Sequence, residues 1–424
     1  MVAPLSQASN NSTGMAGYTS SCGAGASTSA YVGTQQLAIL PGCSSSGMGE
    51  IQRVTGGSKL GETMTFTLSA DVDIHSEIHY TYDVVDQPGA LGDMWGNLFG
   101  LKMIKDVTIK VGTSVWETID QASMLAMAQL EMTGAEYTLW ATGLNGLSNP
   151  PKSQSGTPAD SALPSGGGKL MCCVKGGYRG QLFVAAMPYQ SITVKISLNS
   201  AAYCLDASTV TPPSPVETNF TLYTKQHILS PYERGLMQST DILQLLGTTQ
   251  YYTEPLTAAI TELPSIDLSF FNDYCTHIAV WCTKGNSAII GANASELLTN
   301  CEFVYNGTSA QGEQSSVLLE RSSMLGLAGG GRGSLLVKIS NTTLYQDQHI
   351  QLFQIANTPC VTSLSTSQSQ FAPFAGGDGV SNNRYDVIQF NAHPIAPIPA
   401  GSHIHFVAFG AQSVLYSAGG AVKN

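Results

Sequence analysis

Residues 181–201 constrain the fold more than any other stretch of the chain. From Ile192 to Leu198, apolar side chains alternate with Thr193, Lys195 and Ser197. This period of two predicts a strand with one buried face and one solvated face. Residues 182–187 are apolar at every position, which predicts that this part is covered on both sides. Pro188 lies between the two halves and has no N–H for a sheet, so the pattern indicates two strand segments joined at the corner of a β-sandwich.

The shortage of charge narrows the class of protein. Charged residues make up 11% of the chain, against roughly a quarter in an average soluble domain, and the formal net charge is −11. The 18 Lys and Arg residues form no basic run, so we expect no direct contact with nucleic acid. No apolar run is long enough for a transmembrane helix, and the first residues lack the pattern of a signal peptide. A chain whose polar residues are mostly uncharged can bury much of its surface against copies of itself, so the composition favours a self-assembling protein.

The chain divides into an arm and two β units. Residues 1–49 contain no Asp, Glu, Lys or Arg, and such a segment cannot form a core alone, so residues 1–60 are interpreted as an N-terminal arm. Residues 61–208 form the first unit, in which strands are predicted at 62–68, 71–80, 104–111, 169–174 and 182–198, with a helix at 120–132 ended by Gly134 and a long loop at 142–168. The proline-rich residues 209–218 connect it to the second unit, which runs from 209 to 424.

The second unit begins with a strand at 219–224 and a helix start. Ser230, Pro231 and Glu233 form a capping box, which predicts a short helix to about Met237. Further strands are predicted at 266–270, 277–281, 334–339, 349–355, 385–390 and 404–409. Strands at this spacing, with no βαβ alternation, predict an all-β chain of two antiparallel jelly rolls.

The nine cysteines are interpreted as buried reduced thiols rather than a disulfide framework. Their number is odd, and no two form a C-x-x-C pair.

Two groups of histidines are the only candidates for metal binding. His75, Glu77 and His79 share one face of a predicted strand, and His403 and His405 form a similar pair. Two imidazoles and a carboxylate can hold zinc, but H-x-E-x-H on a strand is not a metalloprotease motif. We interpret both groups as solvated strand faces and expect no metal, no cofactor and no catalytic residue.

The remaining motifs are weaker. Residues 165–169 and 325–333 are glycine-rich but lack the pattern of a phosphate or dinucleotide loop, so both are interpreted as flexible loops. Of the Asn-x-Ser/Thr sequons, Asn293 and Asn306 are the best candidates for glycosylation because they fall in predicted loops. The other sequons start at Asn10, Asn11, Asn219 and Asn341.

Five segments together resemble the major capsid proteins of nucleocytoplasmic large DNA viruses, a double jelly-roll family. They are a strand, turn and helix start at 107–120, a strand pair at 170–198, the inter-barrel segment 222–234, the Ser-Asn-Asn-Arg-Tyr-Asp segment at 381–386 and the closing strand and tail at 406–424. The order and spacing of these segments is similar to that of the family. One departure is Ser269-Phe-Phe-Asn-Asp, which stands where the family has Phe-Asn-His-Pro.

The resemblance implies two eight-stranded jelly rolls in one chain and a structural, non-enzymatic function. It implies homotrimers that form pseudo-hexagonal capsomers, contact neighbouring trimers and tile an icosahedral shell. Its expected partners are minor capsid and penton proteins, and an internal membrane reached through the minor proteins. The implied location is the virion shell, with assembly in the host cytoplasm.

Two other functions fit parts of the pattern. A secreted or surface β-sandwich that binds glycans would use exposed aromatic side chains, for which Trp95 and Trp140 are the candidates. A double-barrel enzyme of the cupin kind would need a His/Glu metal set in each barrel, and the second unit has none in motif spacing.

Overall fold

The computed structural model describes most of both predicted units. The described residues are 28–32, 35–39, 45–85, 94–96, 98–132, 134–145, 163–174, 180–207, 216–271, 274–275, 277–284, 298–309, 351–354, 380–381, 387–394, 397–417 and 420–423. The predicted strand at 334–339, the glycine-rich residues 325–333 and the sequons at Asn10, Asn11, Asn293 and Asn341 lie outside them.

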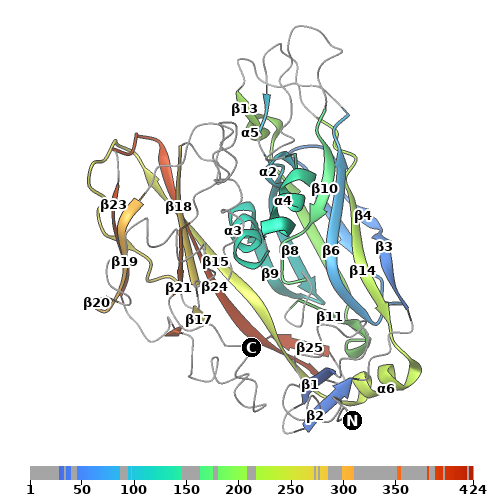
Figure 1. The fold of residues 1–424 in the computed structure, drawn as a ribbon. Helices are drawn as coiled ribbons and strands as arrows, with labels where there is room; N and C mark the ends of the chain where they lie inside the picture. Colours follow the sequence, from blue (N-terminus) through green and yellow to red (C-terminus); the bar gives the residue numbers. More distant parts are fainter. Residues whose placement is uncertain are drawn as a thin grey trace, which may run out of the picture.

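The first sandwich consists of two facing antiparallel sheets, seen on the right of Figure 1. One sheet has the order β10-β6-β14-β3, with β11 also paired to β6, and the other has the order β4-β5-β12-β8-β9. The strands of the first sheet are β10 (Ser165–Lys169), β6 (Ile74–Asp83), β14 (Thr221–Ile228), β3 (Ser45–Ile51) and β11 (Leu182–Phe183). Those of the second are β4 (Arg53–Thr55), β5 (Thr63–Thr67), β12 (Ile192–Leu198), β8 (Ile104–Val111) and β9 (Ser114–Asp120).

The alternating residues predicted from sequence lie where expected. In β12, Ile192, Val194, Ile196 and Leu198 are buried, and the residues between them are partly or fully exposed. Val107 and Ile109 of β8 are fully buried and oppose Ile196 and Val194 of β12. The corner at Pro188 is a turn, with buried residues 181–187 before it and β12 after it. The sandwich corner predicted for this stretch is therefore confirmed.

The second sandwich is built around two very long strands. Its larger sheet has the order β2-β1-β15-β24-β18-β21, with β25 also on β24, and it faces a sheet of order β16-β23-β19-β20. The strands of the larger sheet are β1 (Thr28–Val32), β2 (Gln35–Ile39), β15 (Ile242–Leu256), β18 (His277–Lys284), β21 (Gln351–Gln354), β24 (Ser402–Ser417) and β25 (Gly420–Lys423). Those of the smaller sheet are β16 (Ile266–Asp267), β19 (Leu298–Tyr305), β20 (Thr308–Ser309) and β23 (Ile388–Pro394). Two short pairs, β7 (Met94–Trp95) with β13 (Leu205–Ala207) and β17 (Tyr274–Cys275) with β22 (Val380–Ser381), complete the strands described.

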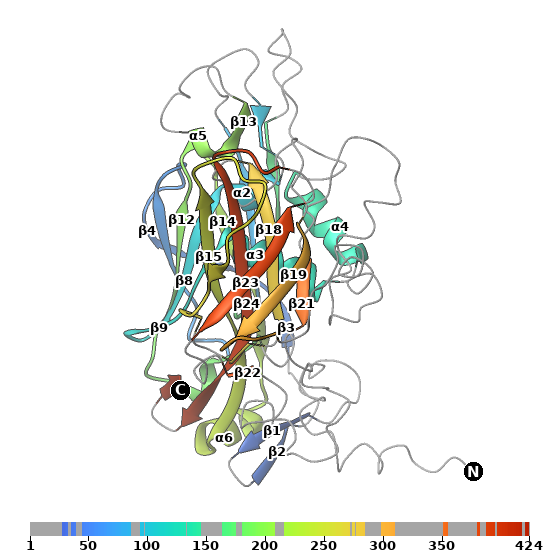
Figure 2. The ribbon, with the colours of Figure 1, turned by 90° about the vertical axis from the view of Figure 1, so that its left-hand side faces the viewer.

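The helices lie between and around the sandwiches. They are α2 (Phe99–Lys102), α3 (Gln121–Glu131), α4 (Gly134–Gly143), α5 (Ala201–Cys204), α6 (Pro231–Ser239) and the 3-10 helix η2 (Val184–Ala186). Helix α3 lies between the two sandwiches, and α4 lies near the edge formed by β10 (Figures 1 and 2). The capping box of α6 is present as predicted, with the Ser230 side chain bound to the backbone N–H of Glu233 and the Glu233 side chain bound to that of Ser230.

Four local predictions are wrong. Gly134 does not end a helix but begins α4, and Met132 is the C-cap of α3. Residues 165–169, predicted as a flexible loop, form β10, where the small glycines allow close approach to β6 and α4. Residues 170–174, predicted as a strand, are irregular and buried. Residues 184–186 are buried as predicted but form η2 rather than a strand.

The larger sheet of the second sandwich is covered on both faces. Ile278, Val280 and Phe406 point into the core of the second sandwich, where Phe406 packs edge-on against Phe390 with ring centroids 5.1 Å apart. The alternate residues of the same strands, including Trp281 and Val407, belong to the hydrophobic core of the first sandwich. The two sandwiches therefore share one continuous apolar interface within the chain.

Five cysteine side chains among the described residues, at Cys172, Cys173, Cys204, Cys282 and Cys301, are buried and form no disulfide. For these residues the prediction of buried thiols is confirmed. Burial raises the pKa of both Cys204 and Cys301 to about 12, which keeps these thiols protonated and unreactive.

Candidate functional site

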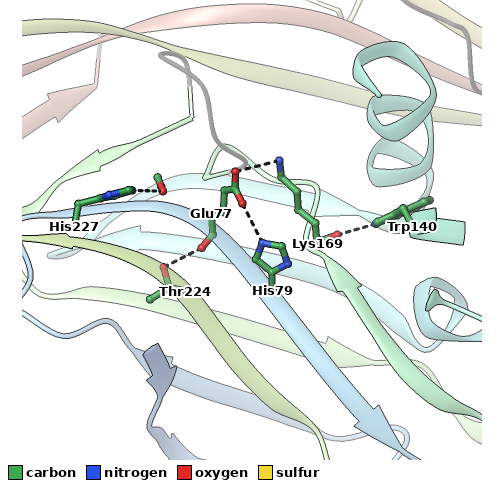
Figure 3. Close-up of polar contacts among 7 residues, drawn as sticks. Glu77, His79, Trp140, Lys169, Thr224 and His227 are labelled. Carbon is green, nitrogen blue, oxygen red and sulfur yellow. Dashed lines mark hydrogen bonds and ion pairs between the residues drawn. The ribbon is translucent and has the colours of Figure 1, made fainter. Parts of the chain in front are cut away.

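The first candidate group lies on the outer side of β6 and β10. Figure 3 shows Glu77 between His79 and Lys169, with Nε2 of His79 3.1 Å from Oε2 and Nζ of Lys169 3.8 Å from Oε1. His75 bonds elsewhere: its Nε2 lies 3.0 Å from the Ser69 carbonyl, and its Nδ1 lies 3.2 Å from the Thr224 hydroxyl. The three residues that share a face in the sequence pattern therefore do not converge on one point.

Charge and burial make this group an ion-pair network. The hydrogen bond from His79 lowers the pKa of Glu77, and the charges of Lys169 and Lys225 lower it further, although partial burial opposes them. Burial lowers the pKa of His75, so its imidazole is neutral at neutral pH. His75 is fully buried, which corrects the prediction that it lies on a solvated face. Among the described residues, no three His, Cys, Asp or Glu side chains are placed to hold a metal ion.

A serine and a histidine on the neighbouring strands β6 and β14 are bound to each other. Ser76 Oγ lies 2.7 Å from Nε2 of His227, although the two residues are 151 positions apart in the chain. Such a bond is one half of the arrangement that activates a serine nucleophile. Both residues are buried, at 4% and 5% exposure, so a substrate could not reach the hydroxyl. The pair joins β6 to β14 and was missed because no local motif marks it.

The second histidine pair lies where the two sandwiches meet. His405 on β24 is 1% exposed and stacks on Trp281, with ring centroids 5.2 Å apart. Its Nε2 lies 2.8 Å from the Thr283 hydroxyl, and its Nδ1 lies 3.0 Å from the Tyr251 hydroxyl. Burial lowers the pKa of His405 to about 3, with a smaller contribution from His403. The solvated face predicted for His405 is therefore wrong, and the neutral imidazole is a structural group.

The aromatic candidates for glycan binding are not available at the surface. Trp95 is 3% exposed and packs edge-on against Phe99, and Trp140 is 6% exposed and donates from Nε1 to the carbonyl of Lys169. Stacking on a sugar needs an exposed ring face. Neither of the two residues named for glycan binding can therefore stack on a sugar in this structure.

The one preferred sequon that the structure describes lies in a hairpin. Asn306 has φ 46° and Gly307 has φ 80°, and these two residues join β19 to β20 as a tight turn. Asn306 is exposed, and its Oδ1 accepts a hydrogen bond from the backbone N–H of Val387 at 3.0 Å. Asn306 therefore remains a prediction as a modification site, with its position at an exposed hairpin now established.

No helix in the described part of the chain combines the length and the apolar character needed to cross a membrane.

Comparison by sequence gives no relatives. No protein-family model matches the chain, and a search of curated proteins finds no significant match.

Comparison by structure gives several matches along nearly the whole chain. The quasi-atomic model of the PBCV-1 virus capsid aligns with a TM-score of 0.66 at 11% identity, over 89% of this chain and 96% of that one. The chain has the double jelly-roll fold. The Faustovirus major capsid protein aligns with a TM-score of 0.53 at 8% identity, over 88% of this chain and 90% of that one. The Sputnik virophage structure aligns with a TM-score of 0.51 at 11% identity, over 92% of this chain and 90% of that one.

The comparison confirms the predicted fold class. It matches structures of three different viruses at 8–11% identity, so the likeness concerns the fold and does not single out one virus lineage.

Proposed function

We propose that this chain is the major capsid protein of an icosahedral virus. The observation that carries the proposal is the double jelly roll, which aligns over 88–92% of this chain with the PBCV-1 capsid, Faustovirus and Sputnik structures. The low charge of the chain and the apolar interface between its sandwiches support the same function. The two sandwiches pack on each other within the chain, and a surface with few charged residues can be buried against further copies.

The fold supports a finer proposal about assembly. Each chain contributes two sandwiches, so three chains would supply six and would form a pseudo-hexagonal capsomer. We propose that such homotrimers contact neighbouring trimers and tile the shell, with minor capsid and penton proteins as partners. The sequence resemblance to large DNA viruses further suggests an internal membrane reached through the minor proteins, no direct contact with nucleic acid, and assembly in the host cytoplasm.

Light scattering on the purified full-length chain tests the proposal. We expect a species of three chains of 44.6 kDa each. Electron microscopy of the same sample should show particles with a hexagonal outline. Electron microscopy of the native virus particle should show a faceted shell. If the chain stays monomeric at all concentrations, including those at which a shell would assemble, the proposal is contradicted.

Glycan binding is the alternative function and now has less support. Trp95 and Trp140, its two candidate residues, are both buried. A glycan array that shows selective, saturable binding by a monomer would favour it over the capsid function.

A further inference from the structure

Strand β3 has a free edge on the outside of the first sandwich. All seven of its residues, Ser45 to Ile51, pair with β14 on one side. On the other side no described residue pairs with it, and it is the last strand of its sheet. Figure 1 places β3 along the outer border of the sandwich. The backbone N–H and C=O groups of this edge therefore face outward without a strand partner among the described residues.

Within the described part of the chain, this edge lacks the usual protection against pairing. Natural edge strands are blocked by Lys or Pro, by inward charges or by a covering element. Residues 45–51 read Ser-Ser-Gly-Met-Gly-Glu-Ile, with no Lys or Pro and with Glu50 as the one charge. Five of the seven residues are exposed, and Met48 is 54% exposed at the middle of the strand. An exposed edge with this composition fits another β-strand better than a charged or bulky ligand.

The sequence of β3 is suited to pair with itself. If two copies align antiparallel with Met48 opposite Met48, Gly47 faces Gly49 and Ser46 faces Glu50. No two like charges are opposite in this register, because Glu50 faces Ser46. Such a contact is self-complementary, as a two-fold interface requires.

We propose that β3 pairs edge-to-edge with β3 of a second copy of this chain, about a two-fold axis through Met48. The contact joins the first-sandwich sheets of the two copies into one sheet of doubled width. The proposed capsid function does not itself specify this contact. A three-fold axis cannot relate two chains by a two-fold, so in a shell of trimers this contact joins chains of different trimers.

A cysteine at the axis tests the register directly. Residues directly opposite in an antiparallel pair have Cα atoms about 4.5–5.5 Å apart, within the range that a disulfide spans. Under mild oxidation, full-length M48C should form a disulfide-linked dimer of chains. The wild type controls for the native cysteines, and V54C, at a 59% exposed position on β4 away from the axis, controls for chance collisions. If M48C forms no more dimer than V54C, the register proposed here is wrong.

A charge exchange tests the contact without relying on oxidation. Met48 lies opposite Lys225 within its own sheet, so M48E gains a favourable cross-strand pair and should keep the fold. Across the axis M48E brings two carboxylates together, and M48K brings two ammonium groups together. M48K also opposes Lys225 within its own sheet, so its stability has to be measured before its association is interpreted. Sedimentation velocity should show that each variant alone associates at least tenfold more weakly than the wild type. An equal mixture of M48E and M48K should recover most of the association.

The outcomes separate this inference from the proposed function. Trimers whose further association is unchanged by M48E overturn the inference and leave the capsid function standing. If M48C forms disulfide-linked dimers while the wild-type chain never forms trimers, the inference is supported and the capsid function is contradicted. Circular dichroism of each variant confirms that the fold is retained.

Discussion

At the scale of single residues, two ionisable groups, the partly buried Asp120 and the fully buried His405, oppose each other in their effect on stability. Burial raises the pKa of Asp120 to about 6, although hydrogen bonds from Ser123 lower it. The folded chain then binds more protons at this group than the unfolded chain, so this contribution to stability falls as pH rises from about 4 to about 6. His405 has a pKa lowered to about 3. The unfolded chain binds more protons there, so its contribution falls as pH drops from about 6.5 to about 3.

Replacing Asp120 by Asn should separate the two effects. Asn also caps helices well, and it carries no charge to bury, so D120N should raise the free energy of unfolding at pH 7 by at most about 3 kcal/mol. Below pH 6 the gain in stability should shrink, because the wild-type carboxyl is then protonated. In D120N the stability should also fall more steeply as the pH drops, because only the effect of His405 remains. Urea unfolding at pH 4, 5, 6 and 7 measures this, with D241N as the control at an exposed carboxylate. An equal change at pH 4 and pH 7 would refute the assignment.

Sequence reasoning found Asp120 as a helix start but could not find its burial. The cap depends on Ser123, three residues away, whereas burial depends on the second sandwich packed over α3. The same limit explains His75, Trp95 and Trp140. The neighbouring residues in the sequence predicted that each side chain is exposed, but each is buried in the folded chain.

At the scale of elements, α6 is held by one local and one distant interaction. The local one is the capping box. The distant one joins Arg234 to Asp73, 161 residues away, with Nε 2.7 Å from Oδ1 and Nη2 2.9 Å from Oδ2. The buried Asp73 also accepts from the backbone N–H of Leu229 at 2.7 Å. This pair fixes the connection between β14 and α6 to the start of β6.

Replacing Arg234 by Met should destabilise the chain by about 1–3 kcal/mol. The change keeps the aliphatic stem but leaves the Asp73 carboxylate buried without its cation, and the partial exposure of Arg234 reduces the cost below that of a fully buried pair. Chemical denaturation at neutral pH measures the loss. Q238M, an exposed position on the same helix, is the matched control and should change stability by less than about 0.5 kcal/mol. An R234M chain as stable as Q238M would show that the ion pair contributes nothing.

Elements with a local signal were predicted, and elements without one were not. The capping box of α6 and the alternation in β8 and β12 are contained in a few neighbouring residues. Strand β10 is mostly glycine, so no side-chain pattern marks it, and it exists because glycine allows close approach to Tyr80 and to Gly143 of α4. Strand β15 was missed because Gly247, the Thr pair after it and Pro255 interrupt its pattern. Its 15 residues are held by pairing with β24.

At the scale of the whole molecule, Tyr416 connects the two sandwiches. It lies on β24 and is fully buried among residues of the first sandwich, with its ring edge-on to Phe183 at 5.1 Å and to Trp116 at 6.0 Å. Its hydroxyl donates to Oε1 of Gln244 at 2.8 Å. The sequence predicted two sandwiches but not this junction, because nothing in a strand pattern says which of two apolar faces meets the other domain.

Since the two cores share this interface, we expect the whole chain to unfold in a single transition, and Y416A to divide it into two. The substitution should cost about 3–5 kcal/mol, as for other buried aromatic residues, and the lost contacts lie at the junction. F390A removes a ring from the interior of the second sandwich and should cost a similar amount while the transition stays single, because the junction is intact. Calorimetry of the isolated chain distinguishes these outcomes through the ratio of calorimetric to van't Hoff enthalpy, which is near one for a single transition and rises when two domains unfold separately. A wild-type chain with two well-separated transitions would show that the sandwiches are independent, and the rigidity assumed for a shell unit would then have to come from contacts between chains.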